Sequence, residues 1–562
     1  MKLTFFDSPA ARTRIRSDKV TLFPEGILGY LVGPTMALLA NSVIANYFNA
    51  YMSNVLDINK WASGFFTSLP VISVTFVVAG NILAGRLMDH IRTRAGKAHP
   101  MLLMSVPLSL LSLAVLFILS PYVNETMQDR QLMALILIAV GYMLWFGIAS
   151  PMYAIPHAAL VSLSTRDSKD RGLLATISNA TALAAMGVVS MILPFFLRLL
   201  FVYDMSGRGT PVLNDAGEIL YYTDEAGAAL YDGLASYNHW KLFVIILMVI
   251  TAVGAVIEYY FTRERVTEEN MAVQAADTES APALTVREQM MICFADRFWV
   301  LLMVFLFLYQ LGGMLKNVSQ LYFCQAMFKD AQGNYTVANG GTIQGMLAII
   351  GAIPTALGMF IAVPLSNRIG KGRAIQMGAV LAALGGIPGL LFADNLPIVI
   401  ASFVLKALGS TPAMYLSLAL MADILDHQEA LHGKRTDGLT MTVYGAIFSG
   451  MIGIATGLMN GVLSMMHYSS SNISSPAIRA AMPWIFIGGE VIGFAVIACL
   501  FLFMKVENYG AYDRAAIRMD HAAAGAGGDS DSAEEEGFED TPDLRDFNAQ
   551  REAAGRRPLR VR

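Results

Sequence analysis

Residues 298–326 read FWVLLMVFLFLYQLGGMLKNVSQLYFCQA and carry a single charged side chain, Lys316. A helix that crosses a bilayer needs about 20 mostly apolar residues, so this segment is long enough to span a membrane. Helices are expected because lipid does not satisfy exposed backbone groups, and because the run is too long for a barrel strand. About twelve stretches of this kind occur, near residues 26–51, 61–87, 100–122, 131–160, 173–201, 240–262, 298–326, 341–366, 374–393, 396–421, 439–466 and 482–505. The sequence therefore predicts an all-α polytopic membrane protein.

The composition supports this prediction. Of 562 residues, 55% are hydrophobic and 15% are charged, whereas soluble proteins carry about 25% charged residues. Mean hydropathy is +0.53. This balance excludes most soluble enzymes and disordered scaffolds, and a net charge of −4 without a basic face argues against a nucleic-acid partner. The three cysteines (Cys293, Cys324 and Cys499) are widely spaced and have no metal-ligand pattern, so we expect no metal and no cofactor.

The charge of the connecting segments predicts the topology. Lysine and arginine gather in alternate loops, which the positive-inside rule places in the cytoplasm together with both termini. The first residues show no secretory signal. We therefore expect a multi-pass protein of the plasma (inner) membrane, with two halves of six helices as in major facilitator transporters. The expected parts are a cytoplasmic segment 1–24, a six-helix bundle 25–263 whose outside loop 203–238 has room for a short hairpin, a cytoplasmic linker 264–297, a second bundle 298–506, and an acidic cytoplasmic tail 507–562 that we expect to be disordered.

Two charged segments between spans are candidate cytoplasmic gates. Residues 85–100 read GRLMDHIRTRAGKAHP, and residues 423–438 read DILDHQEALHGKRTDG. In the second segment three carboxylates recur at i, i+3 and i+6, so they share one face of a helix end. Such charges are able to pair when the inner gate closes and to separate when it opens; the alternative for the first segment is a role in setting topology alone. The proposed gate residues are Asp89, Arg92, Arg94, Lys97, Asp423, Asp426, Glu429, Arg435 and Asp437.

Together the two segments resemble the glycoside-pentoside-hexuronide:cation symporter family, the melibiose-carrier branch of the major facilitators. The residues that carry the resemblance are Gly85, Asp89, Arg92, Arg94, Gly96, Lys97 and Pro100, then Asp423, Asp426, Glu429, Arg435 and Asp437. The resemblance implies a twelve-helix major facilitator fold and the symport of sugars with a cation by alternating access.

The chain departs from this family where the family binds its cation and sugar. In the family, acidic residues on the first, second and fourth helices bind the cation and the sugar, but here the corresponding positions hold Thr35, Val77, Asn81 and Ala154. The sugar-binding arginine of the fifth helix is replaced by Asn179, and the lysine of the eleventh helix by Ser449. Because a hard cation such as sodium prefers several oxygen ligands, usually including a carboxylate, we expect the usual cation site to be missing.

Four ionisable residues remain within the predicted spans: Lys316, Lys406, Glu490 and His157. Such groups are costly in a membrane and are functional candidates. We assign substrate binding to Lys316, Asn317, Gln320, Asn81, Asn179 and Tyr309, and coupling to Glu490 and Lys406. The alternative is a structural pair, either Lys316–Glu490 or Lys406–Glu490. His157 is expected to be a hydrogen-bonded helix residue rather than a proton relay. Asn41, Asn46, Asn49 and Gln344 are further neutral contacts for a solute.

These observations predict a secondary transporter for a sugar, glycoside or related organic solute. A second hypothesis is a proton-driven or uncoupled transporter of an organic anion or amphiphile that uses Lys316. A membrane enzyme would need His, Asp or Cys residues clustered at one depth, and a receptor would need a large soluble module; the sequence indicates neither. We find no ATP-binding Walker loop. The expected partners are a small-molecule solute, a proton or monovalent cation, and the lipid bilayer, and we expect a monomer.

Overall fold

The computed structural model describes residues 13–561 apart from 92, 94, 166–167, 215–216, 225–226, 266–285, 434–435, 470–471 and 526–537. In the first half of the chain, the helices are α1 (Gly33–Asn54), α2 (Ile58–Trp61), α3 (Ser63–His90), α4 (His99–Leu113), α5 (Gln128–Leu144), α6 (Ser150–Ser164), α7 (Ser168–Leu200) and α8 (Gly233–Phe261). Wider π-helical turns extend three of them: η3 (Leu22–Val32) precedes α1, η4 (Ala114–Leu119) follows α4, and η5 (Trp145–Ala149) joins α5 to α6.

The second half of the chain is also helical. Its elements are α10 (Val286–Ala295), α11 (Arg297–Met327), α12 (Val337–Ile369), α13 (Lys371–Leu391), α14 (Leu396–His432), α15 (Asp437–Met465), α16 (Pro476–Pro483), η6 (Trp484–Gly488), α17 (Gly489–Leu500), the short 3₁₀ turn η7 (Val506–Tyr509), α18 (Gly510–Gly525) and α19 (Pro542–Ala553). Among the described residues, eleven helices are long and apolar enough to cross a membrane. The remaining predicted span, 173–201, falls in α7, whose apolar stretch Ala184–Leu200 is shorter. The prediction of an all-α, multi-pass membrane fold is therefore confirmed.

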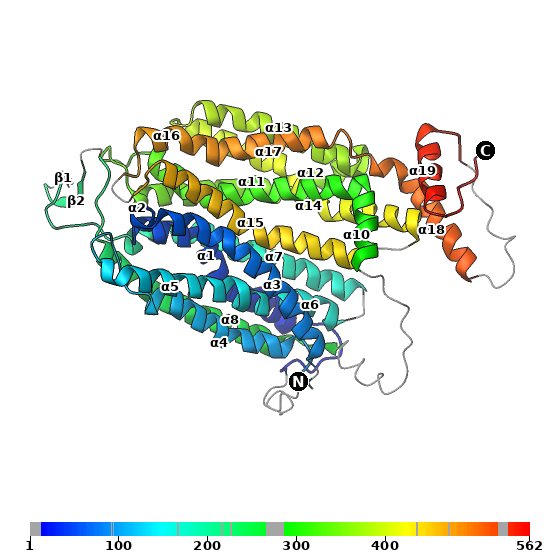
Figure 1. Cartoon of the computed structure of the whole chain (residues 1–562), viewed down its shortest axis with the longest axis horizontal. Coiled ribbons are helices and arrows are strands. Elements are labelled where there is room, and N and C mark those ends of the chain that lie inside the picture. Colours follow the sequence, from blue (N-terminus) through cyan, green and yellow to red (C-terminus); the bar gives the residue numbers. More distant parts are fainter. Residues whose placement is uncertain are drawn as a thin grey trace. The chain divides into compact units, whose positions relative to one another are not determined.

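A short β-hairpin lies between α7 and α8, as the sequence of the 203–238 loop allowed (Figure 1). Strands β1 (Thr210–Leu213) and β2 (Ile219–Thr223) pair antiparallel, with Thr210 opposite Thr223. A bulge between Val212 and Leu213 shifts the register before the turn.

The chain divides into two compact units: the first combines segments from both halves of the sequence, and the second is built from the second half alone. The first unit contains Met1–Ser280, Met314–Ile349 and Ser449–Phe486, and the second contains Ala281–Gly313, Ile350–Phe448 and Ile487–Arg562. The predicted boundaries of the two six-helix bundles, 25–263 and 298–506, stay a prediction.

In the first unit, helix α1 packs against α8 with almost no side chain between them. A Cβ atom placed on Gly254 of α8 would lie 2.5 Å from the backbone nitrogen of Ala37 and 2.6 Å from the carbonyl oxygen of Gly33. A Cβ on Gly33 would lie 2.8 Å from the backbone nitrogen of Glu258. Glycine therefore brings the two backbones together, as small residues do between membrane helices, and fixes Glu258 against α1.

In the second unit, the C-terminal helices α18 and α19 pack on the end of α14. Leu544 and Phe547 of α19 are fully buried, and the Asp513 carboxylate of α18 lies 2.8 Å from Nδ1 of His427. Burial raises the pKa of Asp513, although the His427 imidazole favours its ionised form. The side chain of Arg551 donates to Asp520 and to the carbonyl oxygen of Ala430.

The structure thus differs from the expectation of a disordered tail for the residues on either side of the acidic run. Leu544 and Phe547 recur at helical spacing, so they form an apolar face that folds onto α14. The acidic run itself, within 526–537, lies outside the described residues.

Candidate functional site

The predicted substrate residues of α11 lie on a helix that is mostly apolar. Tyr309, Lys316 and Gln320 recur at i, i+7 and i+11, which places them on one helical face. Gln320 is buried and donates to the carbonyl oxygen of Gln344 at 3.5 Å, whereas Lys316 is half-buried.

The other predicted substrate residues are placed differently. Asn317 is half-buried on the same helix, and Asn81 is half-buried on α3. The side chain of Asn179, on α7, is outside the described set. Asn46, expected as a neutral contact, instead donates to the carbonyl oxygen of Ser42 in its own helix at 2.7 Å.

The two predicted coupling residues form a buried ion pair. The ammonium of Lys406 on α14 contacts the carboxylate of Glu490 on α17, and their side chains are 4% and 10% exposed. A Cβ on Gly386 would lie 3.1 Å from Cδ of Lys406, so α13 makes room for the lysine stem. This is one of the two structural pairs that the sequence left open. A buried pair of this kind compensates two charges that would each be costly alone; a coupling role for it stays a prediction.

The first predicted gate segment is held by a carboxylate from outside it. Glu264 accepts hydrogen bonds from the backbone nitrogens of Lys97 (3.0 Å), Ala98 (2.9 Å) and His99 (2.9 Å), and its Oε1 lies 2.7 Å from Nδ1 of His99. Burial is the largest single influence on Glu264 and opposes its ionisation. The hydrogen bonds and the imidazole of His99 together outweigh it and lower its pKa. Arg92 and Arg94 lie outside the described residues, and so does the side chain of Asp89.

In the second predicted gate segment, Asp423 pairs with Lys371 of α13 at 2.6 Å. Asp426 and Glu429 are both half-buried on the same helix end, which stops at Gly433 with a left-handed φ of 65°. Arg435 and the side chain of Asp437 lie outside the described residues. The gating role of both segments stays a prediction.

The structure adds a buried carboxylate that the sequence analysis did not single out. Glu258 of α8 is fully buried and is held by two residues of α6, and we refer to Glu258, Tyr153 and His157 as the Glu258 cluster. The Tyr153 hydroxyl donates to one carboxylate oxygen, and Nδ1 of His157 lies 2.7 Å from the other. The two rings stack with their centroids 5.7 Å apart at 9°, and Nε2 of His157 lies 3.4 Å from the Ser178 hydroxyl.

The Glu258 cluster bears on two expectations. His157 is hydrogen-bonded, as expected. The sequence analysis named only Lys316, Lys406, Glu490 and His157 as ionisable residues within the spans, and Glu258 adds a buried carboxylate to them. The sequence contained a signal for this residue, because Glu258 falls within the predicted span 240–262, where a carboxylate is costly.

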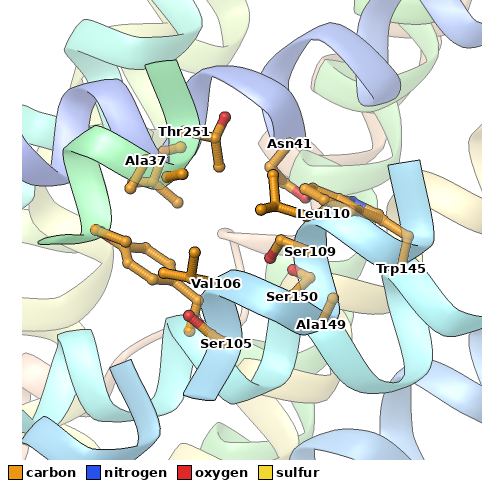
Figure 2. Close-up of a pocket in the computed structure, with 14 residues that line it drawn as sticks. Ala37, Asn41, Ser105, Val106, Ser109, Leu110, Trp145, Ala149, Ser150 and Thr251 are labelled. Atoms are coloured by element: carbon orange, nitrogen blue, oxygen red, sulfur yellow. Dashed lines mark hydrogen bonds between the residues drawn. The ribbon is translucent and has the colours of Figure 1, made fainter. Parts of the chain in front are cut away.

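A small pocket adjoins the Glu258 cluster. It has a volume of about 20 Å³, and fourteen residues of α1, α4, η5, α6 and α8 line it (Figure 2). Tyr153 lines the pocket and also bonds Glu258. The Thr251 hydroxyl, in a residue that is 6% exposed, has no hydrogen-bond partner among the described residues. Across the pocket, the indole nitrogen of Trp145 donates to Oδ1 of Asn41 at 3.3 Å.

A second polar group joins the end of α1 to α11 and to the segment after α15. We refer to Asn49, Ser53, Asn54, Tyr322 and Tyr468 as the tyrosine network. The Tyr322 hydroxyl lies 2.7 Å from the Ser53 hydroxyl and accepts from Asn49 at 3.1 Å, and the Tyr468 hydroxyl donates to Asn54 at 2.6 Å. All five residues are buried. Asn49, which the sequence suggested as a solute contact, is therefore part of a helix-to-helix contact.

Known proteins of similar sequence are transporters. The chain is 23% identical over 483 residues to the glucuronide carrier protein homolog of Escherichia coli (strain K12), which covers 84% of this chain and 91% of that protein. It is 23% identical over 506 residues to the isoprimeverose transporter of Lactiplantibacillus pentosus, with 87% and 90% covered.

Solved structures show the same fold at lower sequence identity. The nucleoside transporter NupG aligns with a TM-score of 0.51 at 13% identity, covering 85% of this chain and 100% of that one. A D-xylose-proton symporter aligns with a TM-score of 0.51 at 12% identity, covering 83% and 97%. Together with the relatives, these matches confirm the expected resemblance to glycoside-pentoside-hexuronide symporters and the major facilitator fold. Residues 29–508 match the MFS/sugar transport protein family, and the chain is a member of this family of membrane transporters.

Proposed function

We propose that this transporter carries a sugar, a glycoside or a related small organic solute by alternating access, as a symporter. The relatives are named as a glucuronide carrier homolog and an isoprimeverose transporter, which supports a glycoside as the solute. We further propose a monomer in the plasma (inner) membrane with both termini in the cytoplasm, which the distribution of lysine and arginine supports.

The polar face of α11 is the observation that carries the proposed solute site. Lys316 is the one charged side chain in the sequence 298–326, and Asn317 and Gln320 lie close to it on α11, a few residues after Gly312 and Gly313. A charged side chain at the centre of a membrane helix costs roughly 2.5–3.5 kcal/mol in insertion measurements, so such a residue is retained where it binds something. Asn81, Asn179 and Tyr309 complete the proposed site.

A second candidate solute is an organic anion or amphiphile, moved by protons or by its own gradient. The cation of Lys316 favours it, because an ammonium within an apolar span suits a carboxylate-bearing solute. Hydrogen bonds to charged groups contribute about 1.5–3 kcal/mol. The contact with Lys316 would then tighten the binding of such a solute tenfold or more.

The coupling ion we favour is the proton. The positions where the family binds its cation hold Thr35, Val77, Asn81 and Ala154, which supply few of the oxygen ligands that sodium needs. A proton needs only one titratable group, and the described residues offer buried ones.

Uptake by the full-length protein in proteoliposomes tests the proposed function. The probes are radiolabelled isoprimeverose, which is neutral, and a p-nitrophenyl glucuronide, which carries a carboxylate. We expect at least one of them to accumulate. Uptake of neither, with folded protein in the vesicles, would contradict the proposed solute class.

The variant Lys316→Ala separates the two candidates. If Lys316 binds a carboxylate, the variant loses glucuronide uptake and keeps isoprimeverose uptake. Equal loss of both would assign Lys316 to the shared sugar site, and retention of both would remove it from the site. Lys60→Ala is the control, because Lys60 is an exposed lysine paired with Glu125 at 2.8 Å.

A further inference from the structure

We propose that the Glu258 cluster is a proton-binding site, with Glu258 and His157 sharing the proton that the transporter moves with its solute. The inference rests on the proposed transport function and adds to it the site of the coupling ion. None of its three residues occupies a position where the family is expected to bind its cation.

The carboxylate is placed where an unbalanced charge is unfavourable. Glu258 is 0% exposed, and its two oxygens are bonded by a phenol and by an imidazole, of which the imidazole carries a positive charge only when it is protonated. With the imidazole unprotonated, an ionised carboxylate leaves one net negative charge in the interior. Uptake of one proton removes that net charge, so the cluster has a physical reason to bind a proton.

The cluster also has an atom that is able to hold the proton, Nε2 of His157. In the unprotonated state, Nδ1–H of His157 donates to Glu258, and the Ser178 hydroxyl, 3.4 Å away, is able to donate to Nε2. When Nε2 gains a proton, it donates to the same Ser178 oxygen, which is able to accept. The imidazolium and the carboxylate then form an ion pair, and no other hydrogen bond of the cluster has to break.

The charged and titratable groups around the cluster are themselves paired. From η3, Glu25 accepts from both terminal nitrogens of Arg265 at 2.7 and 2.8 Å. The Tyr30 hydroxyl, also from η3, contacts Ser164. From α4, His99 bonds Glu264. Each of these groups has a partner of its own, whereas the Glu258 carboxylate is bonded by Tyr153 and His157.

The cluster also has access from the pocket. The Tyr153 hydroxyl donates to Glu258, and Tyr153 is one of the residues that line the pocket. A water molecule needs roughly 10–15 Å³, and the pocket has about 20 Å³. The Thr251 hydroxyl, in a residue only 6% exposed and without a partner among the residues described, offers a water a further hydrogen bond. A water held there would exchange a proton with Glu258 through the Tyr153 hydroxyl.

Infrared spectroscopy of the purified full-length protein in lipid tests the site without any solute. Spectra recorded at pH values between about 5 and 8, the range in which histidine titrates, are expected to show a change in imidazole and carboxyl bands. Because the chain has eight histidines, the site is measured as the difference between wild type and variant: Glu258→Gln and His157→Gln should each remove the same imidazole and carboxyl component of the change. The control Asp513→Asn removes another buried carboxylate–imidazole pair, with His427, and should leave that component in place. An identical change in Glu258→Gln and in the wild type would overturn the proposal.

Transport provides the second test, with whichever probe, isoprimeverose or p-nitrophenyl glucuronide, the wild type carries. Glu258→Gln should keep solute-for-solute exchange, which moves no net proton. Its concentrative uptake under an imposed pH gradient should fall by about 5- to 150-fold, the usual range of coupling between two ligands. Undiminished pH-driven uptake would overturn the proposal.

Two further outcomes are covered by this design. If Glu258→Gln does not give monodisperse protein, Glu258→Asp replaces it and should shift the pH midpoint of uptake; an unchanged midpoint would refute the site. If the wild type carries neither probe, the proposed solute class fails, and the infrared comparison still decides whether Glu258 binds a proton.

Discussion

Replacement of Tyr322 by phenylalanine is expected to favour opening of the tyrosine network. The Tyr322 hydroxyl is buried, with the residue 1% exposed, and it is bonded to Ser53 at 2.7 Å and to Asn49 at 3.1 Å. Phenylalanine keeps the ring, which packs at 5.3 Å from the ring of Tyr468, and removes only the hydroxyl. The variant therefore tests the hydrogen bonds rather than the packing.

The size of the effect follows from the two groups that lose their partner. A buried polar group left without a hydrogen bond costs about 1–3 kcal/mol, and Ser53 and Asn49 recover this energy when water reaches them in an open state. Ser53 keeps a weak contact to the carbonyl oxygen of Ala50 at 3.4 Å, which reduces its share. We therefore expect a total shift of about 1–3 kcal/mol, which corresponds to a 5- to 150-fold larger open population.

The native cysteine Cys324 reports this opening. It is 0% exposed and lies two residues after Tyr322 on α11. In a background with Cys293→Ser and Cys499→Ser, the rate of modification by N-ethylmaleimide should rise in proportion to the open population. The expected rise for Tyr322→Phe is the 5- to 150-fold derived above.

Two controls separate opening from general loss of stability. Tyr222→Phe removes a hydroxyl from the hairpin, outside the network, and should leave the rate unchanged. In a second background that retains only Cys293, which is buried in the second unit, Tyr322→Phe should not alter labelling. An unchanged Cys324 rate in folded Tyr322→Phe protein would refute the reasoning, and so would an equal rise at Cys293.

Three further predictions concern stability, measured as the free energy of unfolding of the purified protein. Lys406→Met should lower it by about 3–5 kcal/mol because the buried carboxylate of Glu490 loses the cation of Lys406, and adding Glu490→Leu should restore much of the loss; a double variant as unstable as the single one would contradict the pair. Gly254→Ala should cost about 1–3 kcal/mol because its Cβ meets backbone atoms at 2.5–2.6 Å, whereas Gly187→Ala, which meets nothing within 4 Å, should be neutral or stabilising. Folding lowers the pKa of Glu264. The stabilisation by its ionised carboxylate should therefore be fully present above pH 4.5, the ordinary pKa, and should be lost as the pH falls through the lowered pKa of the folded protein. Glu264→Gln should therefore be less stable than the wild type by about 1–3 kcal/mol at neutral pH, with the gap closing in acid; a gap that is constant with pH would show that ionisation is not involved.

The elements that sequence predicted well are those that depend on local signals. Eleven helices of the described residues are apolar runs long enough to cross a bilayer, and the hairpin near Thr210 lies in the loop 203–238, where the sequence left room for one. The pairing of Glu490 was predictable in outline, because a carboxylate in an apolar helix needs a cation. That Lys406 pairs with Glu490 depends on which helices pack together, and that information is not local.

Glu258 and the C-terminal helices show two ways in which sequence reasoning missed a feature. The comparison with family positions directed attention to the first, second and fourth helices, where no carboxylate is present at those positions, while the buried carboxylate is on α8. In the tail, the acidic run dominated the composition and hid the apolar face that Leu544 and Phe547 form with helical spacing. Both features depend on contacts between distant segments, with Tyr153 and with α14 respectively.

The ion that drives uptake is the most direct test of the central claim, which is that this family member has replaced metal-ion coupling by proton coupling. Solute accumulation by the wild-type protein in proteoliposomes should be measured with a pH gradient and with a sodium gradient, each imposed separately at zero membrane potential. The account predicts concentrative uptake with the pH gradient and none with the sodium gradient alone. Accumulation that requires sodium and ignores the pH gradient would contradict it.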